Sequence, residues 1–221
     1  MSTDERRLTL LRANWLWTGH DLYADGAVAI NQQGFVVSVG THAQVTAALE
    51  AAQISTISTQ VTLGESVLTP GLVNAHSHAF QRMFRGHVQW RASEKDSFWS
   101  WREAMYAAAN SLDPEAVQEV SRRCFEEMIT AGVTHVGEFH YLHRDPSGRH
   151  YDDPDELALR VIEAARQAGL RITLLRTIYG AGGIDRPLQA NQRRFQTDSV
   201  DEALGSIERL RRHPDPLVCI G

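Results

Sequence analysis

The first part of the chain alternates short apolar runs with turn residues, which is the pattern of β-strands. Asp25-Gly26 and Gln33-Gly34 separate three of these runs, so we predict antiparallel strands joined by tight turns. The predicted elements are strands at residues 7–18, 27–31, 35–40 and 61–63 and a short helix at 42–53.

After Leu68 the period of the apolar residues changes, and helical patterns alternate with strand-like runs. Asp113 and Pro114 provide a cap and a first helical residue, and the apolar positions that follow share one helix face. Asp153 and Glu156 have the spacing of a capping box at the start of another helix. The predicted elements are helices at 114–131, 153–168 and 199–212, with strands at 133–140, 170–179 and 217–221.

This alternation indicates parallel βαβ units. Four strands are expected, near Leu72, Val136, Leu174 and Val218. A complete (β/α)8 barrel takes about 250 residues, and about 155 remain here after the β-rich front. The sequence therefore predicts an α/β chain that carries the first half of a barrel, as part of a larger enzyme.

Composition excludes several classes of protein. The chain of 221 residues is 43% hydrophobic, carries a formal charge of -5 and contains two cysteines. It lacks an apolar run of about 20 residues and an excess of basic residues, so neither a membrane span nor a nucleic-acid partner is expected. The charged start at residues 1–7 does not fit a signal peptide. These features favour a cytoplasmic protein.

His76 and His78 stand two apart at the end of the strand-like run that follows Leu68. Alternate residues of a strand share a face and lie about 6.6 Å apart, so both imidazoles can reach one metal ion. With 10 histidines in the chain, however, such a pair also arises by chance. The spacing alone fits a metal site, a structural pair or an exposed pair.

Four longer segments carry a more specific signal. They are NAHSHAFQRMFRGH (74–87), DSFWSWREAMY (96–106), EFHYLHRDPSGRHYDDP (138–154) and ANQRRF (190–195). Together they resemble the formimidoylglutamate deiminase family of the amidohydrolase superfamily, over roughly residues 68–196. The resemblance implies a partial β-sandwich at residues 1–66 and the first half of a (β/α)8 catalytic barrel at 67–221, with the active site at the carboxyl ends of the strands.

The resemblance also implies roles for five residues. His76 and His78 match the first two zinc ligands, Gln81 and Tyr141 match residues that contact substrate, and Arg102 matches an arginine that binds a substrate carboxylate. Without the resemblance, each of the last three has an ordinary interpretation. Arg102 would form a surface ion pair, Tyr141 would be an aromatic residue packed over the barrel mouth, and Gln81 would be a polar residue on a helix.

The implied reaction is the hydrolysis of N-formimino-L-glutamate to N-formyl-L-glutamate and ammonia in histidine degradation, by a water that one zinc ion activates. The remaining zinc ligands and the acid–base residues are expected beyond Gly221. This chain alone is therefore expected to bind zinc weakly and to be inactive. The whole enzyme would act on a small molecule with carboxylates, and a homo-oligomer is left open.

Two alternatives stay open. The chain could belong to another amidohydrolase, such as a guanine-type deaminase or a triazine-type chlorohydrolase, or it could be a non-catalytic half-barrel that serves binding or assembly. Glu138 is expected to point into the barrel. His140, His143 and His150 lie in or beside a long loop that fits either substrate gating or a solvated surface.

Overall fold

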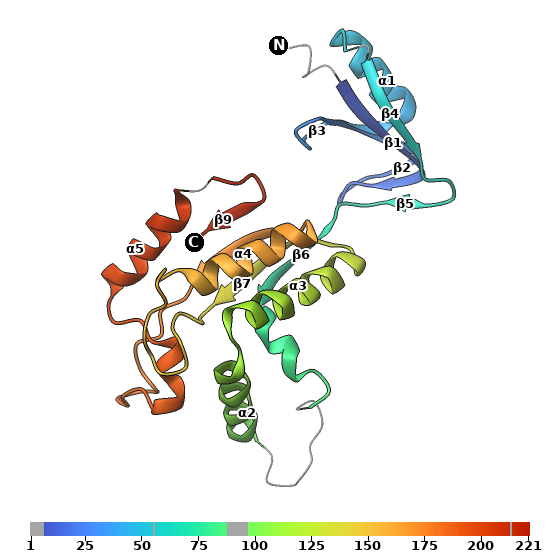
Figure 1. Cartoon of the computed structure of the whole chain (residues 1–221). Coiled ribbons are helices and arrows are strands. Elements are labelled where there is room, and N and C mark those ends of the chain that lie inside the picture. Colours follow the sequence, from blue (N-terminus) through green and yellow to red (C-terminus); the bar gives the residue numbers. More distant parts are fainter. Residues whose placement is uncertain (1–6, 55, 88–96, 213) are drawn as a thin grey trace. The chain divides into compact units, whose positions relative to one another are not determined.

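The computed structural model describes residues 7–54, 56–87, 97–212 and 214–221, which form two compact units divided between Pro70 and Gly71 (Figure 1). The charged residues 1–6, the first residue of the DSFWSWREAMY segment and His213 lie outside the described residues.

The first unit is a five-stranded sheet with one helix packed on a face. Its elements are β1 (Arg7–Trp17), β2 (Leu22–Asn31), β3 (Val36–Thr41), α1 (His42–Ala51), β4 (Thr56–Thr62) and β5 (Val67–Leu68). The strand order is β3-β2-β1-β4, with β5 also paired to β1. The first three strands are antiparallel, as predicted, but β4 and β5 run parallel to β1. Its core consists of Leu8, Leu10, Ala27, Ala29, Val45 and Leu49.

The Asp25-Gly26 prediction is wrong, because both residues lie inside β2. The β1–β2 turn forms earlier, where the Thr18 hydroxyl accepts from the backbone N–H of Asp21 at 3.0 Å. Glycine is needed at position 26 for a different reason: a Cβ there would lie 2.1 Å from the Cβ of Leu16 on the paired strand. The glycine therefore serves strand packing, and the exposed Asp25 accepts from Arg12 Nε on β1 at 2.6 Å.

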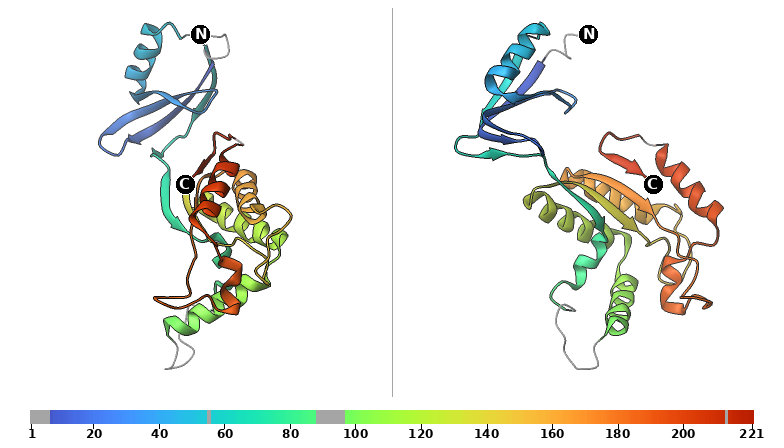
Figure 2. Two further views of the ribbon diagram at one scale, coloured as in Figure 1. Left: turned by 90° about the vertical axis from the view of Figure 1, so that its left-hand side faces the viewer. Right: turned by 180° about the vertical axis from the view of Figure 1, so that it is seen from behind.

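The second unit contains four parallel strands in the order β6-β7-β8-β9, with helices between them (Figures 1 and 2). Its strands are β6 (Leu72–Ser77), β7 (Val133–His140), β8 (Arg171–Arg176) and β9 (Val218–Ile220), and its helices are η2 (Ala79–Phe84), α2 (Phe98–Ser111), α3 (Pro114–Thr130), α4 (Glu156–Ala168), η3 (Ala190–Phe195) and α5 (Val200–Arg211). All four expected strands are present. This arrangement confirms the predicted α/β class and corresponds to part of an eight-stranded barrel.

Alternation along β7 and β8 separates two faces of this sheet. Val136, Ile172 and Leu174 are fully buried in a core shared with α3 and α4, which lie side by side against the sheet (Figure 1). His135 and Phe139 lie on the opposite face, which corresponds to the barrel interior. Within the described residues no helix has the length and apolarity to cross a membrane.

The start of α4 departs from the predicted capping box. The helix begins after Asp155, whose side chain caps no backbone N–H, while Asp153 accepts from the backbone of Asp155 at 2.8 Å. The buried Asp155 carboxylate instead accepts from the Ser206 hydroxyl at 2.6 Å and from Arg209 Nε at 2.7 Å on α5. A buried carboxylate needs strong partners, so this tertiary contact replaces the local cap.

Replacing Asp155 with alanine should lower the free energy of unfolding by about 2 to 3 kcal/mol, because it leaves the buried Ser206 hydroxyl without its acceptor and removes the ion pair with Arg209. Denaturant unfolding of the 221-residue chain measures this change. The exposed Asp152 supplies the control, since Asp152→Ala should change stability by less than about 0.5 kcal/mol. Equal effects of the two substitutions would contradict the bridging role of Asp155.

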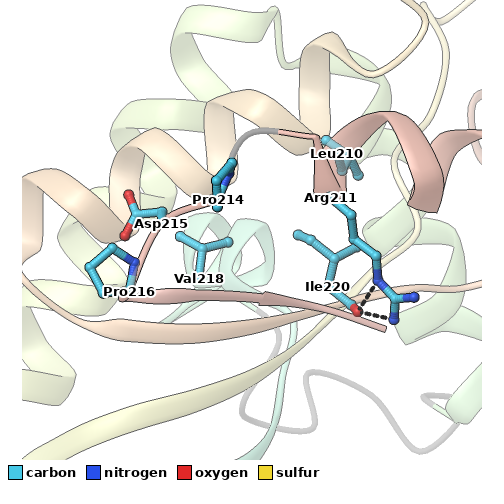
Figure 3. Close-up of a pocket in the computed structure, with 7 residues that line it drawn as sticks. All are labelled: Leu210, Arg211, Pro214, Asp215, Pro216, Val218 and Ile220. Atoms are coloured by element: carbon cyan, nitrogen blue, oxygen red, sulfur yellow. Dashed lines mark hydrogen bonds between the residues drawn. The ribbon is translucent and has the colours of Figure 1, made fainter.

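The last strand is held to α5 by a side chain as well as by pairing with β8. The Arg211 guanidinium donates two hydrogen bonds, of 3.1 and 2.6 Å, to the carbonyl oxygen of Ile220 (Figure 3). A cavity of about 410 Å³ beside this contact is lined by Pro214, Val218 and other residues between α5 and β9. Arg211 therefore fastens the end of β9 to the end of α5.

The two cysteines should differ in reactivity. Burial on α3 raises the pKa of the Cys124 thiol to about 11, whereas Cys219 is exposed on β9. Since the thiolate is the reactive form, a maleimide at pH 8 should label Cys219 at least about tenfold faster than Cys124. Mass spectrometry of peptides from the native and the unfolded chain reports both rates. Equal labelling of the two thiols in the native chain would contradict the burial of Cys124.

Candidate active site

His76 and His78 bring their imidazoles together at the carboxyl end of β6. Their Nε2 atoms are 3.2 Å apart. The His78 Nδ1 lies 2.9 Å from the carbonyl oxygen of Phe139 on the neighbouring strand, and the Phe139 ring packs 4.4 Å from the His76 ring. Both histidines are thus oriented by β7.

This pair has the geometry of two ligands to one metal ion. Two nitrogens bound at 2.0–2.1 Å to a tetrahedral ion lie about 3.3 Å apart. The Phe139 carbonyl accepts the Nδ1 hydrogen of His78, so the lone pair of this ring is at Nε2, and such a backbone contact is common for metal-binding histidines. Burial lowers the pKa of His78, which keeps the ring neutral as a ligand must be. Two imidazoles therefore fit a zinc ion, but across the described residues no set of three candidate ligands comes together.

Glu138 does not point into the barrel interior, contrary to the sequence prediction. It lies on the helix-covered face of β7 with Val136, and its exposed fraction is 2%. Its Oε1 accepts from the backbone N–H of Ala79 at 2.7 Å, directly after His78. Burial raises the pKa of Glu138 to about 7. The carboxyl group thus fixes the backbone beside His78 and does not reach toward the metal-binding atoms.

A cavity of about 240 Å³ opens next to His78. It is lined by residues of α2 and of the strand ends: His78, Phe98, Trp101, Arg102, Met105, Tyr106, Phe139, Tyr141, Thr177, Ile178 and Tyr179. Three of the five sequence-predicted site residues, His78, Arg102 and Tyr141, therefore line one cavity. The other two contact this group, since His76 faces His78 and Gln81 Nε2 donates to the Tyr141 hydroxyl at 2.7 Å.

Tyr141 joins the histidine pair to the rest of the cavity. Its ring stands edge-on to the His78 ring with centroids 4.8 Å apart. Burial raises the pKa of Tyr141, so its hydroxyl is protonated at neutral pH. Because this oxygen accepts from Gln81, its own hydrogen is available as a donor within the cavity.

Neutral polar groups hold the guanidinium of Arg102. Its guanidinium donates to the hydroxyls of Tyr106 and Tyr179, the latter at 3.4 Å, and to the carbonyl oxygen of Gly182 at 3.2 Å. Among the residues that the structure describes, none forms an ion pair with it, and its Nη1 donates no hydrogen bond. A planar cation held by neutral groups at the edge of a cavity is suited to bind an anion.

The surface ion pair that the sequence allowed for Arg102 does not form. Glu103, the adjacent acidic residue, accepts instead from Asn191 Nδ2 at 3.2 Å. Arg102 Nε bonds to Tyr106 one helical turn away, which directs the guanidinium toward the cavity and away from the surface.

Sequence reasoning assigned no role to Tyr106, Tyr179 or Gln192, although Gln192 lies in the quoted ANQRRF segment. The Gln192 side chain is 2% exposed and donates to both tyrosine hydroxyls, at 2.7 and 3.3 Å. Gly182, in the segment that follows β8, accepts from Arg102 through its carbonyl oxygen. A Cβ at Gly182 would lie 2.4 Å from the carbonyl oxygen of Pro187, so glycine is required there.

The other histidines of this region do not line the cavity. His140 and His143 are buried, and the His143 Nε2 contacts the carbonyl oxygen of Thr177 at 2.9 Å. Burial lowers the pKa of His140 to about 3, so this ring is neutral. The backbone N–H of His143 donates to the carbonyl oxygen of Arg194 at 3.1 Å, which ties the loop after β7 to η3. His150 is exposed, and its Nε2 lies 4.0 Å from Glu202 Oε1.

Comparison with known proteins identifies the family of the chain. The profile of the amidohydrolase family matches residues 67–218. Formimidoylglutamate deiminase of Pseudomonas aeruginosa is 45% identical over 160 residues, which are 72% of this chain and 34% of the relative. The chain thus spans about a third of the length of this curated relative.

Solved structures show the same fold. A crystal structure of an amidohydrolase from Brucella melitensis superposes with a TM-score of 0.72 at 29% identity, over 96% of this chain and 45% of that protein. Atrazine chlorohydrolase from Arthrobacter aurescens, crystallised with zinc, gives a TM-score of 0.69 at 20% identity, over 96% of this chain and 46% of that protein. The family profile, the sequence identity and the fold agree, and the chain belongs to the amidohydrolase family.

Proposed function

We propose that this chain provides the first metal ligands and the substrate-binding wall of an enzyme that hydrolyses N-formimino-L-glutamate to N-formyl-L-glutamate and ammonia. The observation that carries the proposal is the cavity of about 240 Å³, whose lining contains His78 and Arg102, an arginine with no ion-pair partner among the described residues. Similarity to formimidoylglutamate deiminase supports the choice of substrate.

His76 and His78 would hold one divalent ion, which we propose to be zinc, as in the chlorohydrolase structure. When bound, such an ion supplies Lewis-acid activation of water near neutral pH. The chain's own residues do the binding and orientation. Arg102 binds a carboxylate of the substrate, and the hydroxyl of Tyr141, held by Gln81, donates to the bound molecule near His78.

Two ligands are fewer than the three that catalytic zinc sites normally have. Since the described residues bring no third ligand to the histidine pair, we propose that the 221-residue chain by itself binds zinc weakly and releases no ammonia. Equilibrium dialysis with zinc tests this on the isolated chain. Tight stoichiometric binding that His76→Ala does not weaken would contradict the two-histidine site.

The function is tested by measuring ammonia release from N-formimino-L-glutamate. The protein used is the polypeptide isolated from its own cells, at the length that it has there. We expect activity that a chelator removes and added zinc restores. Failure to release ammonia from this substrate, with a purine or a triazine hydrolysed instead, would replace the proposed substrate while leaving the metal site in place.

A further inference from the structure

Two tyrosines accompany Arg102 in the wall of the cavity. Tyr106 lies on α2 and Tyr179 follows β8, and their hydroxyl oxygens are 3.1 Å apart. Either hydroxyl can donate to the other in this geometry. The direction of this bond decides which of the two hydroxyls keeps its hydrogen for a bound ligand.

Gln192 settles this direction. Its Oε1 accepts from the backbone N–H of Gln189 at 2.9 Å, so its amide nitrogen must be the atom that faces the tyrosines. The amide Nε2 donates to the Tyr106 hydroxyl at 2.7 Å and, more weakly, to the Tyr179 hydroxyl at 3.3 Å. Because Gln192 is 2% exposed, water does not compete for these bonds.

The number of hydrogen bonds at each hydroxyl decides the direction of the bond between them. A phenol oxygen donates one hydrogen bond and accepts about two. The Tyr106 oxygen accepts two close hydrogen bonds, from Gln192 at 2.7 Å and from Arg102 Nε. The Tyr179 oxygen accepts only long ones, from Gln192 at 3.3 Å and from Arg102 Nη2 at 3.4 Å. The Tyr179 oxygen therefore has more room for a third donor, and the Tyr106 hydrogen goes to Tyr179. The Tyr179 hydrogen then has no acceptor, since in the described part of the chain this hydroxyl has no other acceptor within range.

We propose that Tyr179 is a substrate-binding residue, whose hydroxyl donates to the same carboxylate that Arg102 binds, with Tyr106 and Gln192 setting the direction of its hydrogen. The identity of this carboxylate as part of N-formimino-L-glutamate rests on the proposed function, but binding of a carboxylate does not. Burial also raises the pKa of Tyr179, so the hydroxyl is protonated at neutral pH.

This arrangement has a consequence for specificity. A hydroxyl and a guanidinium give a carboxylate two charge-assisted donors that approach from different elements, α2 and the segment after β8. A carboxamide or a neutral heterocycle places an N–H or a carbon where one of the two carboxylate oxygens would accept a hydrogen bond. The pair therefore selects for an anionic group at this end of the substrate.

Glutarate is a suitable probe, because it has two carboxylates and no amidine to hydrolyse. Its dissociation constant is measured by calorimetry with the polypeptide as it occurs in its own cells, for the parent protein and for Tyr179→Phe. We expect Tyr179→Phe to raise the constant about tenfold or more, the usual scale for one hydrogen bond to a charged group. Tyr151→Phe, at a part-buried tyrosine outside the cavity, should leave it unchanged.

A second background separates direct binding from support of Arg102. In an Arg102→Lys protein the contact between Arg102 and Tyr179 is gone, so a tyrosine that only holds Arg102 has nothing left to hold. We expect Tyr179→Phe still to raise the glutarate constant at least about fivefold there. No effect in this background, or no glutarate binding by the parent protein, would overturn the proposal. Binding of glutarate without turnover of N-formimino-L-glutamate would retain it and reject the proposed function.

Discussion

Replacing His78 with alanine is expected to lower kcat/KM for ammonia release from N-formimino-L-glutamate by about a thousandfold or more. His78 and His76 present their Nε2 atoms 3.2 Å apart, and the remaining pair of electrons on His78 faces this gap because Phe139 accepts the other ring hydrogen. Loss of one imidazole from such a site removes a ligand that no neighbouring group among the described residues can replace.

Two readouts from one preparation test this expectation. Kinetics of ammonia release give the activity, and elemental analysis gives the zinc bound per chain. Both should fall together in His78→Ala and in His76→Ala. His20→Ala changes an exposed histidine of the first unit and should match the parent protein in both. Full zinc content with full activity in His78→Ala would show that the pair is not the metal site.

The second large effect concerns Arg102. Arg102→Met should lower kcat/KM on N-formimino-L-glutamate by about a hundredfold, mainly through a higher KM, because a charge-assisted contact with a carboxylate contributes about 2 to 3 kcal/mol. The loss falls on KM because this contact is made in the bound substrate as well as in the transition state. Steady-state kinetics over a wide range of substrate concentration separates the two constants.

The control for Arg102 is an arginine whose side chain is exposed to solvent. Arg149 has a side-chain exposed fraction of 82%, and Arg149→Met should leave KM unchanged. Analogues of the substrate in which one carboxylate is replaced by a carboxamide give a further check. For the analogue that lacks the carboxylate bound by Arg102, Arg102→Met should leave KM nearly unchanged. If Arg102→Met leaves the KM for N-formimino-L-glutamate unchanged, the result would favour a purine- or triazine-type substrate, which has no carboxylate for Arg102 to bind.

Periodic patterns predicted the fold well where the signal is local and repeated. The strand ending in His140 was predicted with its full length, and Asp113 with Pro114 marked the start of α3 correctly. These signals work because alternation and capping depend on neighbours in sequence.

The errors occur where a distant contact decides the role of a residue. Asp25 and Gly26 have the composition of a turn, but Gly26 is required by the nearby Leu16 and Asp25 pairs with Arg12 at 2.6 Å. Asp155 was read within a capping sequence, but its carboxylate binds α5. Neither partner is visible in the local sequence.

The residues of the candidate site also divide into those that the sequence predicted and those whose role depends on distant contacts. Resemblance to a family brought His76, His78, Gln81, Arg102 and Tyr141 forward as a group. The structure places three of them in the lining of one cavity and the other two, His76 and Gln81, in contact with that lining. Tyr179 and Gln192 were missed because their role depends on hydrogen bonds between α2, η3 and the segment after β8. Such bonds follow from the assembled fold and leave no periodic trace in the sequence.

The central claim is that the histidine pair and Arg102 act on one substrate that has both an amidine and a carboxylate. The most direct test compares ammonia release from N-formimino-L-glutamate, guanine and an aminotriazine by the zinc-loaded polypeptide as it occurs in its own cells. We predict a kcat/KM for N-formimino-L-glutamate at least about a hundredfold above that for either heterocycle. A higher kcat/KM for guanine or the triazine would contradict the proposed substrate.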